Sequence, residues 1–170
     1  MSRGPSGPRH FVGEWLLTGN KGFFCSLLIA LLLITAGCRQ QAGLVLESPG
    51  QPERMIELGS VKTFSLHYTH SVEKTPVIEN FTILENGTLL LTSTKYRSYG
   101  VGLPFLPSEG KLTVADGWLL LEDLHREYRD IRVRVGPEAE LSLEYDQKFF
   151  PLYQWYPAGS LVIIRKGFLK

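Results

Sequence analysis

The sequence has little cysteine, and none of it lies in the body of the chain. Cys25 and Cys38 are the only two cysteines in 170 residues, so no disulfide framework and no thiolate metal site is possible after residue 38. The chain also lacks an excess of one charge, because 18 Lys and Arg residues stand against 17 Asp and Glu residues. Without a basic surface to neutralise phosphates, the protein is not expected to bind nucleic acid.

Catalytic motifs are lacking as well. No helical His-Glu-x-x-His motif is present, and after residue 38 there is no cysteine nucleophile. His67 and His70 lie three residues apart on a predicted strand, so their side chains point to opposite faces and do not form a shared metal site. Ser71 follows His70 directly, which is not the geometry of a catalytic triad. We therefore predict no enzyme activity, no metal and no cofactor.

The most distinct feature that is present is an apolar run near the N-terminus. It consists of 17 uncharged residues from Gly22 to Cys38, which is short for a membrane span and slightly long for a secretory signal. Its last four residues, Thr-Ala-Gly-Cys, resemble a bacterial lipobox with Cys38 as the lipid acceptor, although Leu usually stands where Thr35 does. A lipoprotein signal and an uncleaved signal anchor both fit this pattern.

Both hypotheses predict the same topology. The basic residues that precede the apolar run favour a cytoplasmic N-terminus, which places the rest of the chain on the exocytoplasmic side of the membrane, in the cell envelope. Residues 39–55 contain Ser-Pro-Gly and Gln-Pro without an apolar period, which is typical of a flexible tether. We predict three parts, namely a tail with signal or anchor at 1–38, a tether at 39–55 and a β-domain at 56–170.

The β-domain is predicted from alternating apolar and polar residues separated by turn signals. The dipeptides Asn86-Gly87 and Asp116-Gly117 favour tight hairpins. The predicted strands are 62–70, 77–83, 88–96, 111–115, 118–121, 131–135, 139–146 and 161–164. Only residues 121–131 show a helical period. Short strands with regular turns predict an all-β fold, a single antiparallel β-sandwich or partly open β-barrel, preceded by the N-terminal hydrophobic helix.

Two polar residues fall on the apolar face of the first predicted hairpin. Pairing the two strands so that their apolar faces coincide places Tyr68 opposite Glu79. The same register makes His70 and Glu79 diagonal neighbours. A buried carboxylate is unfavourable unless it is paired, so Glu79 is expected to contact His70, Arg97 or a ligand. A structural ion pair and a small polar binding site are both consistent with this pattern.

A second cluster lies between residues 95 and 104. It contains Arg97 and Ser98, followed by Gly100 and Gly102, whose backbones can adopt conformations that other residues avoid. Two interpretations remain open, a glycine turn between strands and an anion-binding loop anchored by Arg97. The spacing of a phosphate-binding loop and its following helix are absent, so nucleotide binding is not predicted.

These two clusters carry a family resemblance. Residues 68–79, Tyr-Thr-His-Ser-Val-Glu-Lys-Thr-Pro-Val-Ile-Glu, and residues 98–104, Ser-Tyr-Gly-Val-Gly-Leu-Pro, resemble the signature stretches of the bacterial domain of unknown function 1850 family. The resemblance covers roughly residues 57–165. It implies a small exported protein, often lipoprotein-like, that is associated with tripartite ATP-independent periplasmic (TRAP) transporters whose solute-binding protein is called TAXI. It implies no catalytic role, and it implies the TAXI-type permease or its solute-binding receptor as partner.

We therefore expect a membrane-tethered exocytoplasmic accessory or interaction protein of a TAXI-type transporter. The residues expected to form its ligand- or partner-binding face are His70, Glu73, Glu79, Arg97, Ser98, Gly100 and Gly102. The alternative is an independent lipoprotein that binds a small organic anion in a pocket containing His70, Glu79 and Arg97. A hydrolase that uses His70 and Glu79 ranks last, because the sequence offers no obvious nucleophile.

Overall fold

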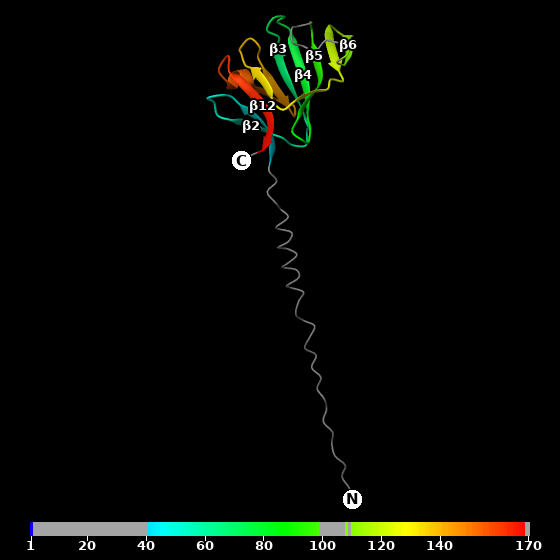
Figure 1. Cartoon of the computed structure of the whole chain (residues 1–170), viewed down its shortest axis with the longest axis vertical. Coiled ribbons are helices and arrows are strands. Elements are labelled where there is room, and N and C mark those ends of the chain that lie inside the picture. Colours follow the sequence, from blue (N-terminus) through cyan, green and yellow to red (C-terminus); the bar gives the residue numbers. More distant parts are fainter. Residues whose placement is uncertain (2–40, 99–107, 109, 169–170) are drawn as a thin grey trace. The chain divides into compact units, whose positions relative to one another are not determined.

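The computed structural model describes residues 41–98 and 110–168, together with Met1 and Ser108 (Figure 1). Its strands are β1 (Ala42–Glu47), β2 (Arg54–Glu57), β3 (Thr63–Thr69), β4 (Pro76–Ile83), β5 (Leu89–Tyr96), β6 (Lys111–Ala115), β7 (Trp118–Glu122), β8 (Arg126–Tyr128), β9 (Ile131–Arg134), β10 (Ser142–Tyr145), β11 (Lys148–Pro151) and β12 (Leu161–Phe168). One helical turn, α2 (Leu152–Trp155), precedes the last strand. None of the helices in these ranges has the length and apolar character to cross a membrane. The predicted signal or anchor at 1–38 lies outside the described ranges.

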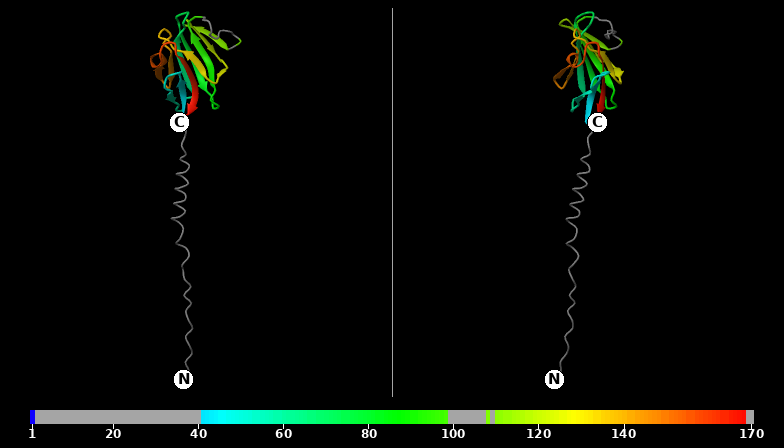
Figure 2. Two further views of the ribbon diagram at one scale, coloured as in Figure 1. Left: turned by 60° about the vertical axis from the view of Figure 1, so that its left-hand side comes forward. Right: turned by 90° about the vertical axis from the view of Figure 1, so that its left-hand side faces the viewer.

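The strands form two antiparallel sheets (Figures 1 and 2). The four-stranded sheet has the order β2-β1-β12-β9. The eight-stranded sheet has the order β11-β10-β3-β4-β5-β7-β6, and β8 pairs with β5 beside that path. The prediction of an all-β domain of antiparallel strands is confirmed. In the described part of the chain these strands make two separate sheets rather than one closed barrel.

The alternation of apolar residues directs one face of each sheet into a shared core. Leu44 and Ile164 from the four-stranded sheet belong to the same buried cluster as Phe64, Leu66 and Phe81 from the eight-stranded sheet. The Phe64 and Phe81 rings stack across β3 and β4 with their centroids 5.1 Å apart. Burial of one such side chain stabilises the fold by about 1.5–3 kcal/mol, so this core is the main source of stability.

Both predicted hairpin turns are confirmed. Gly87 has a φ of 93°, a left-handed conformation that favours glycine, and the Asn86 side chain accepts a hydrogen bond from the Thr88 amide at 3.0 Å. In the second hairpin Asp116 and Gly117 have φ values of 52° and 73°. Two consecutive positive φ values are the signature of the tight turn that matches the twist of antiparallel strands.

The tether predicted at residues 39–55 is wrong for most of its length. Ala42–Glu47 is strand β1, which lies between β2 and β12 and pairs Ala42 with Phe168. Leu44 and Leu46 are fully buried. A short apolar run without alternation is typical of a strand covered on both faces, and β12, one of the two partners of β1, lies more than 100 residues further along the chain. The folded domain therefore begins before residue 56.

Further predictions about single elements also need correction. The helical period at 121–131 does not produce a helix, because Asp123 takes a positive φ of 59° and the chain continues as strand β8 against β5. The strand predicted at 139–146 is limited to Ser142–Tyr145, and the last strand extends to Phe168. Strand β11 and helix α2 carry no clear periodic signal, since each has only four residues.

Candidate functional site

Strands β3 and β4 place a polar pair on the face that packs against the four-stranded sheet. The observed register sets Glu79 opposite Leu66, whereas the prediction set it opposite Tyr68. A shift of two residues keeps every side chain on its face, so Glu79 points inward as predicted. Its polar neighbour is Tyr68, whose hydroxyl donates a hydrogen bond to the Glu79 carboxylate.

The predicted contact between His70 and Glu79 is wrong. His70 lies four residues beyond Leu66, the residue opposite Glu79, and four strand residues span roughly 13 Å. The register differs because the turn after β3 is tighter than the predicted six-residue loop. The His70 amide donates to the Thr75 carbonyl at 2.8 Å, and the Lys74 amide donates to the His70 carbonyl at 2.9 Å.

The electrostatic setting of the pair follows from its burial. Burial raises the pKa of Glu79 above its ordinary value, while the hydrogen bond from Tyr68 and the positive charge of Arg126 lower it. Burial also raises the pKa of Tyr68, and the nearby charge of Glu79 adds to this effect. The Tyr68 phenol therefore stays protonated and acts as the donor of the pair.

A third polar group lies on the same face. Thr94 of β5 is directly opposite Glu79, its side chain is fully buried, and its hydroxyl makes no hydrogen bond within the described residues. A buried hydroxyl without a partner destabilises a fold by about 1–3 kcal/mol. The polar spot thus extends over three neighbouring strands, and its Thr94 hydroxyl has no partner among the described residues.

A cavity of about 190 Å³ opens beside this polar spot, and we call it the Glu79 cavity. Its lining residues are Tyr68, Glu79, Val133, Arg134, Ala139 and Leu141. It therefore lies between the β3–β4 pair and β9, the edge strand of the four-stranded sheet. A larger cavity of about 380 Å³ lies beside β2, but its charged residues Glu57, Asp146 and Lys148 are exposed. A carboxyl with a raised pKa beside an apolar wall makes the Glu79 cavity the better candidate site.

Arg97 does not belong to the Glu79 cavity. Residues alternate along β5, so Lys95 and Arg97 project from the outer face while Thr94 and Tyr96 are buried on the inner face. The Arg97 guanidinium lies 4.7 Å from the centre of the Trp118 ring, and the Lys95 ammonium lies 4.6 Å from it. The predicted pocket of His70, Glu79 and Arg97 is therefore not present, because Arg97 and Glu79 lie on opposite faces of the sheet.

His70 instead organises the turn between β3 and β4. Its ring is buried, and its Nδ1 atom accepts hydrogen bonds from the amides of Val72 at 3.3 Å and Glu73 at 3.2 Å. Lys74 takes a positive φ of 52°, and its ammonium donates to Glu138 at 2.8 Å. The turn is therefore held in one conformation, with the side chains of Val72 and Glu73 exposed.

We expect His70→Ala to loosen this turn, because the two amides lose their common acceptor. The expected loss is about 1–2 kcal/mol in the free energy of unfolding, with faster hydrogen exchange at the amides of Val72 and Glu73. His70→Asn is the matched control, since an asparagine oxygen can accept the same amides. Equal exchange rates in the wild type and in His70→Ala would contradict the assigned role.

Ser98, the first residue of the second signature stretch, contacts the first signature stretch at this end of the domain. The hydroxyl groups of Thr75 and Ser98 share a hydrogen bond of 3.0 Å, and β4 pairs Val77 with Tyr96. Ser98 is thus placed beside the His70 turn, although the two stretches are separated in sequence. Of the predicted site residues, His70, Glu73 and Ser98 are brought together here, while Glu79 lies deeper and Arg97 lies on the outer face.

Other predicted site residues lie outside the described ranges. Gly100, Gly102 and the lipidation site Cys38 are among them. Within residues 41–98 and 110–168, no group of three or more His, Asp and Glu side chains is arranged to hold a metal ion. His67, on the outer face, bonds Glu144 at 2.8 Å through its Nε2 atom.

Three residues of the site were not predicted from the sequence. Arg126 lies in the segment 121–131 that shows a helical period, and Thr94 and Arg134 lie on the predicted strands 88–96 and 131–135 without being predicted site residues. Strict alternation would separate Thr94 from Leu91, and both are buried because the pairing of β4 with β5 shifts register between Asn80 and Phe81. No local pattern in the sequence indicates that β9 lies beside Glu79 and lines the same cavity.

Comparison with known proteins gives one match. Residues 64–152, just over half of the chain, match the family model for a domain of unknown function (DUF1850). This match contains the His70 turn, Glu79 and Ser98. No curated protein and no solved structure matches the chain.

Proposed function

Because the chain belongs to the DUF1850 family, as its two signature stretches predicted, we propose that it is a membrane-tethered exocytoplasmic accessory protein of a TAXI-type TRAP transporter. The proposed partners are the permease, its solute-binding receptor, or both. The apolar run at 22–38 is proposed to be the lipoprotein signal or anchor that holds the β-domain at the cell envelope. The proposal assigns a binding role and no catalytic step.

The observation that carries the proposal is the exposed, fixed turn at residues 70–75. We call the end of the domain where Thr75 of this turn contacts Ser98 the signature end. Val72 is 66% exposed at the tip of a turn whose backbone is held by buried His70. An exposed apolar side chain on a rigid turn loses little conformational freedom on binding, which favours its use as an anchor for a partner. Thr75 and Ser98 supply hydroxyl groups beside it.

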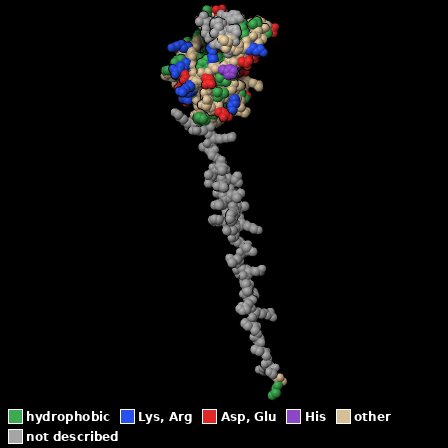
Figure 3. Space-filling model, turned by 45° about the vertical axis from the view of Figure 1, so that its right-hand side comes forward, with side chains coloured by type: hydrophobic (Ala, Val, Ile, Leu, Met, Phe, Trp, Pro, Cys, Tyr) green, Lys and Arg blue, Asp and Glu red, His purple; other side chains and the backbone are tan. Residues whose placement is uncertain are grey.

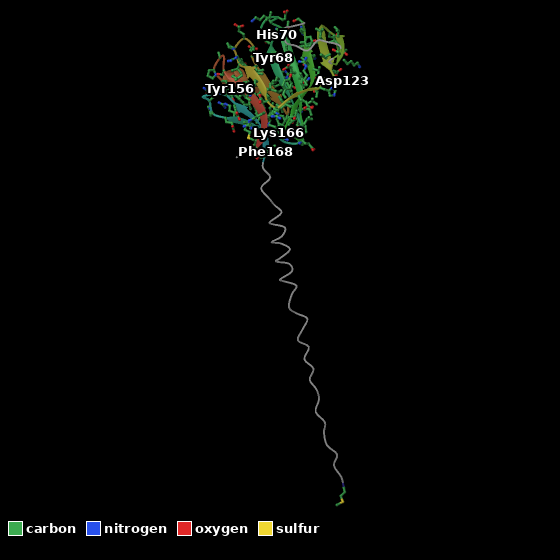
Figure 4. The ribbon with its side chains drawn as sticks, in the orientation of Figure 1. Tyr68, His70, Asp123, Tyr156, Lys166 and Phe168 are labelled. Atoms are coloured by element: carbon green, nitrogen blue, oxygen red, sulfur yellow. The ribbon has the colours of Figure 1, made fainter. Side chains whose placement is uncertain are left out.

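The position of this end within the β-domain supports the proposal. Residue 41 leads into β1 at Ala42, which pairs with Phe168, and Lys166 donates to the Leu84 and Glu85 carbonyls. Figure 4 shows Lys166 and Phe168 at one end of the domain and His70 toward the other. Within the β-domain, the His70 turn is therefore remote from the start of β1.

The charge distribution favours short-range recognition. On the face drawn in Figure 3, Lys and Arg side chains are interspersed with Asp and Glu side chains. The net charge of the whole chain is only +1. A surface of mixed sign gives little long-range steering, so specificity is expected to come from the signature end itself.

The test is co-purification of the tagged protein with the permease and the solute-binding receptor in a mild detergent. Val72→Asp is expected to reduce the recovered partner by about tenfold, because it places a charge in the proposed contact. Val114→Asp is the matched control, since Val114 is also 66% exposed but lies on the edge strand β6. Thermal denaturation should show that both variants are folded.

Two outcomes would count against the proposed function. Reproducible absence of both partners from the wild-type preparation would remove the basis of a transporter role. Equal loss of partner in Val72→Asp and Val114→Asp would show that recognition does not depend on the His70 turn.

A further inference from the structure

The Glu79 cavity presents hydrogen-bond acceptors. Tyr68 donates its only hydroxyl proton to Glu79, so the Tyr68 oxygen is left with acceptor capacity. The ionised Glu79 carboxylate is itself an acceptor, with room for more than one donor. A ligand that contacts both groups must therefore supply N–H or O–H donors, and an ammonium group supplies three of them.

Burial of Glu79 outweighs the two interactions that favour its ionised form, the Tyr68 hydrogen bond and the Arg126 charge. The neighbouring Thr94 hydroxyl also has no partner in the described part of the chain. A cation next to Glu79 would supply the missing favourable interaction, as it does for other buried carboxylates.

The rim of the cavity carries a positive charge, in contrast to the acceptor groups of Glu79 and Tyr68. Arg134 is exposed, and its Nη1 atom donates to the Gly159 carbonyl at 3.0 Å, which leaves further N–H groups of the guanidinium for a ligand. This positive charge disfavours a simple cation at the entrance but suits a carboxylate. Val133, Ala139 and Leu141 form the apolar part of the lining, which suits an aliphatic side chain.

The size of the cavity limits the ligand to a few heavy atoms. A volume of about 190 Å³ corresponds to roughly six water molecules at the density of liquid water. We propose that the Glu79 cavity binds a small aliphatic amino acid, with its ammonium group on Glu79 and Tyr68 and its carboxylate on Arg134. This binding activity goes beyond the proposed accessory function, since it requires no transporter.

The charged and titratable groups around the cavity set the expected pH dependence. They are Tyr68 on β3, Glu79 on β4, Arg126 and Tyr128 on β8, and Arg134 on β9. Of these groups, Glu79 is the one whose side-chain type titrates in the acid to neutral range. The ammonium group pairs with ionised Glu79, so affinity is expected to fall as the pH is lowered through the raised pKa of this carboxyl.

The test is isothermal titration calorimetry of the full-length protein in a mild detergent. L-alanine, L-valine and L-leucine are titrated, and isobutylamine and isobutyrate serve as probes that lack the carboxylate or the ammonium group. At least one of the amino acids is expected to bind, and both simpler probes are expected to bind about tenfold more weakly than L-valine or not at all. Absence of binding by all three amino acids would overturn the proposal, as would equal binding of isobutyrate or isobutylamine.

Substitutions of Glu79 and Arg134 then test whether these residues bind the ammonium group and the carboxylate of the ligand. Glu79→Gln and Arg134→Gln are each expected to lower the affinity about tenfold or more. Glu144→Gln is the matched control, because Glu144 is a glutamate of the same sheet that bonds His67 on the outer face, and its affinity should equal that of the wild type. Unchanged binding in Glu79→Gln would overturn the assigned site, and this result is independent of any co-purification with a transporter.

Discussion

A chain that begins at residue 56 is expected to be unfolded, whereas residues 41–170 are expected to fold. The shorter chain lacks β1, which pairs with β2 on one side and β12 on the other. It loses the fully buried Leu44 and Leu46, each of which stabilises the fold by about 1.5–3 kcal/mol. Together with the lost strand pairing, this approaches the total stability of an ordinary domain, about 5–15 kcal/mol.

Circular dichroism and amide NMR spectra of the two chains provide the measurement. Within residues 41–170, Leu46→Ala is expected to lower the free energy of unfolding by about 2–5 kcal/mol. Leu120→Ala is the matched control, because Leu120 is only partly buried on strand β7 and should lose less. A cooperative unfolding transition in the chain that starts at residue 56 would refute the role of β1.

Strand β1 illustrates why part of the fold could not be predicted from the sequence. The strands β3 and β4 alternate, β5 alternates on either side of one register shift, and all three are joined by short turns, so their approximate bounds follow from local pattern. Strand β1 is short, followed by Ser-Pro-Gly, and paired with a strand at the other end of the chain. Its place in the fold depends on the long-range pairing with β12, which the local periodicity of the sequence does not indicate.

The candidate site also combines features that follow from local pattern with features that depend on long-range contacts. Alternation alone predicts that Glu79 lies on the inner face, and this is confirmed. The prediction of its partner failed because the turn after β3 is closed by backbone bonds at His70, which shifts the register by two residues. Arg134 joins the site only through the packing of the four-stranded sheet over β3 and β4. The residues of one hairpin could be predicted, but their contacts with the second sheet could not.

Glu79→Gln is expected to make the protein more stable at neutral pH. Burial raises the pKa of Glu79 in the folded state above its unfolded value of about 4.3. The folded state therefore holds the proton more tightly, and the stability linked to Glu79 is complete below the unfolded pKa and is lost as the pH rises through the folded pKa. A glutamine does not titrate and can still accept the hydrogen bond from Tyr68, so it avoids this loss.

The free energy of unfolding of both proteins, measured by urea denaturation between about pH 4 and pH 8, tests this expectation. The advantage of Glu79→Gln over the wild type should be smallest at the acid end and should grow to about 1–3 kcal/mol at the alkaline end. Glu144→Gln should show no such gain, because Glu144 is partly exposed and bonds His67. Parallel curves for the wild type and Glu79→Gln would mean that Glu79 is ionised without penalty in the fold. A gain in stability together with a loss of amino-acid binding would show that the buried carboxylate is kept for its ligand, because the fold alone is better served by a neutral side chain.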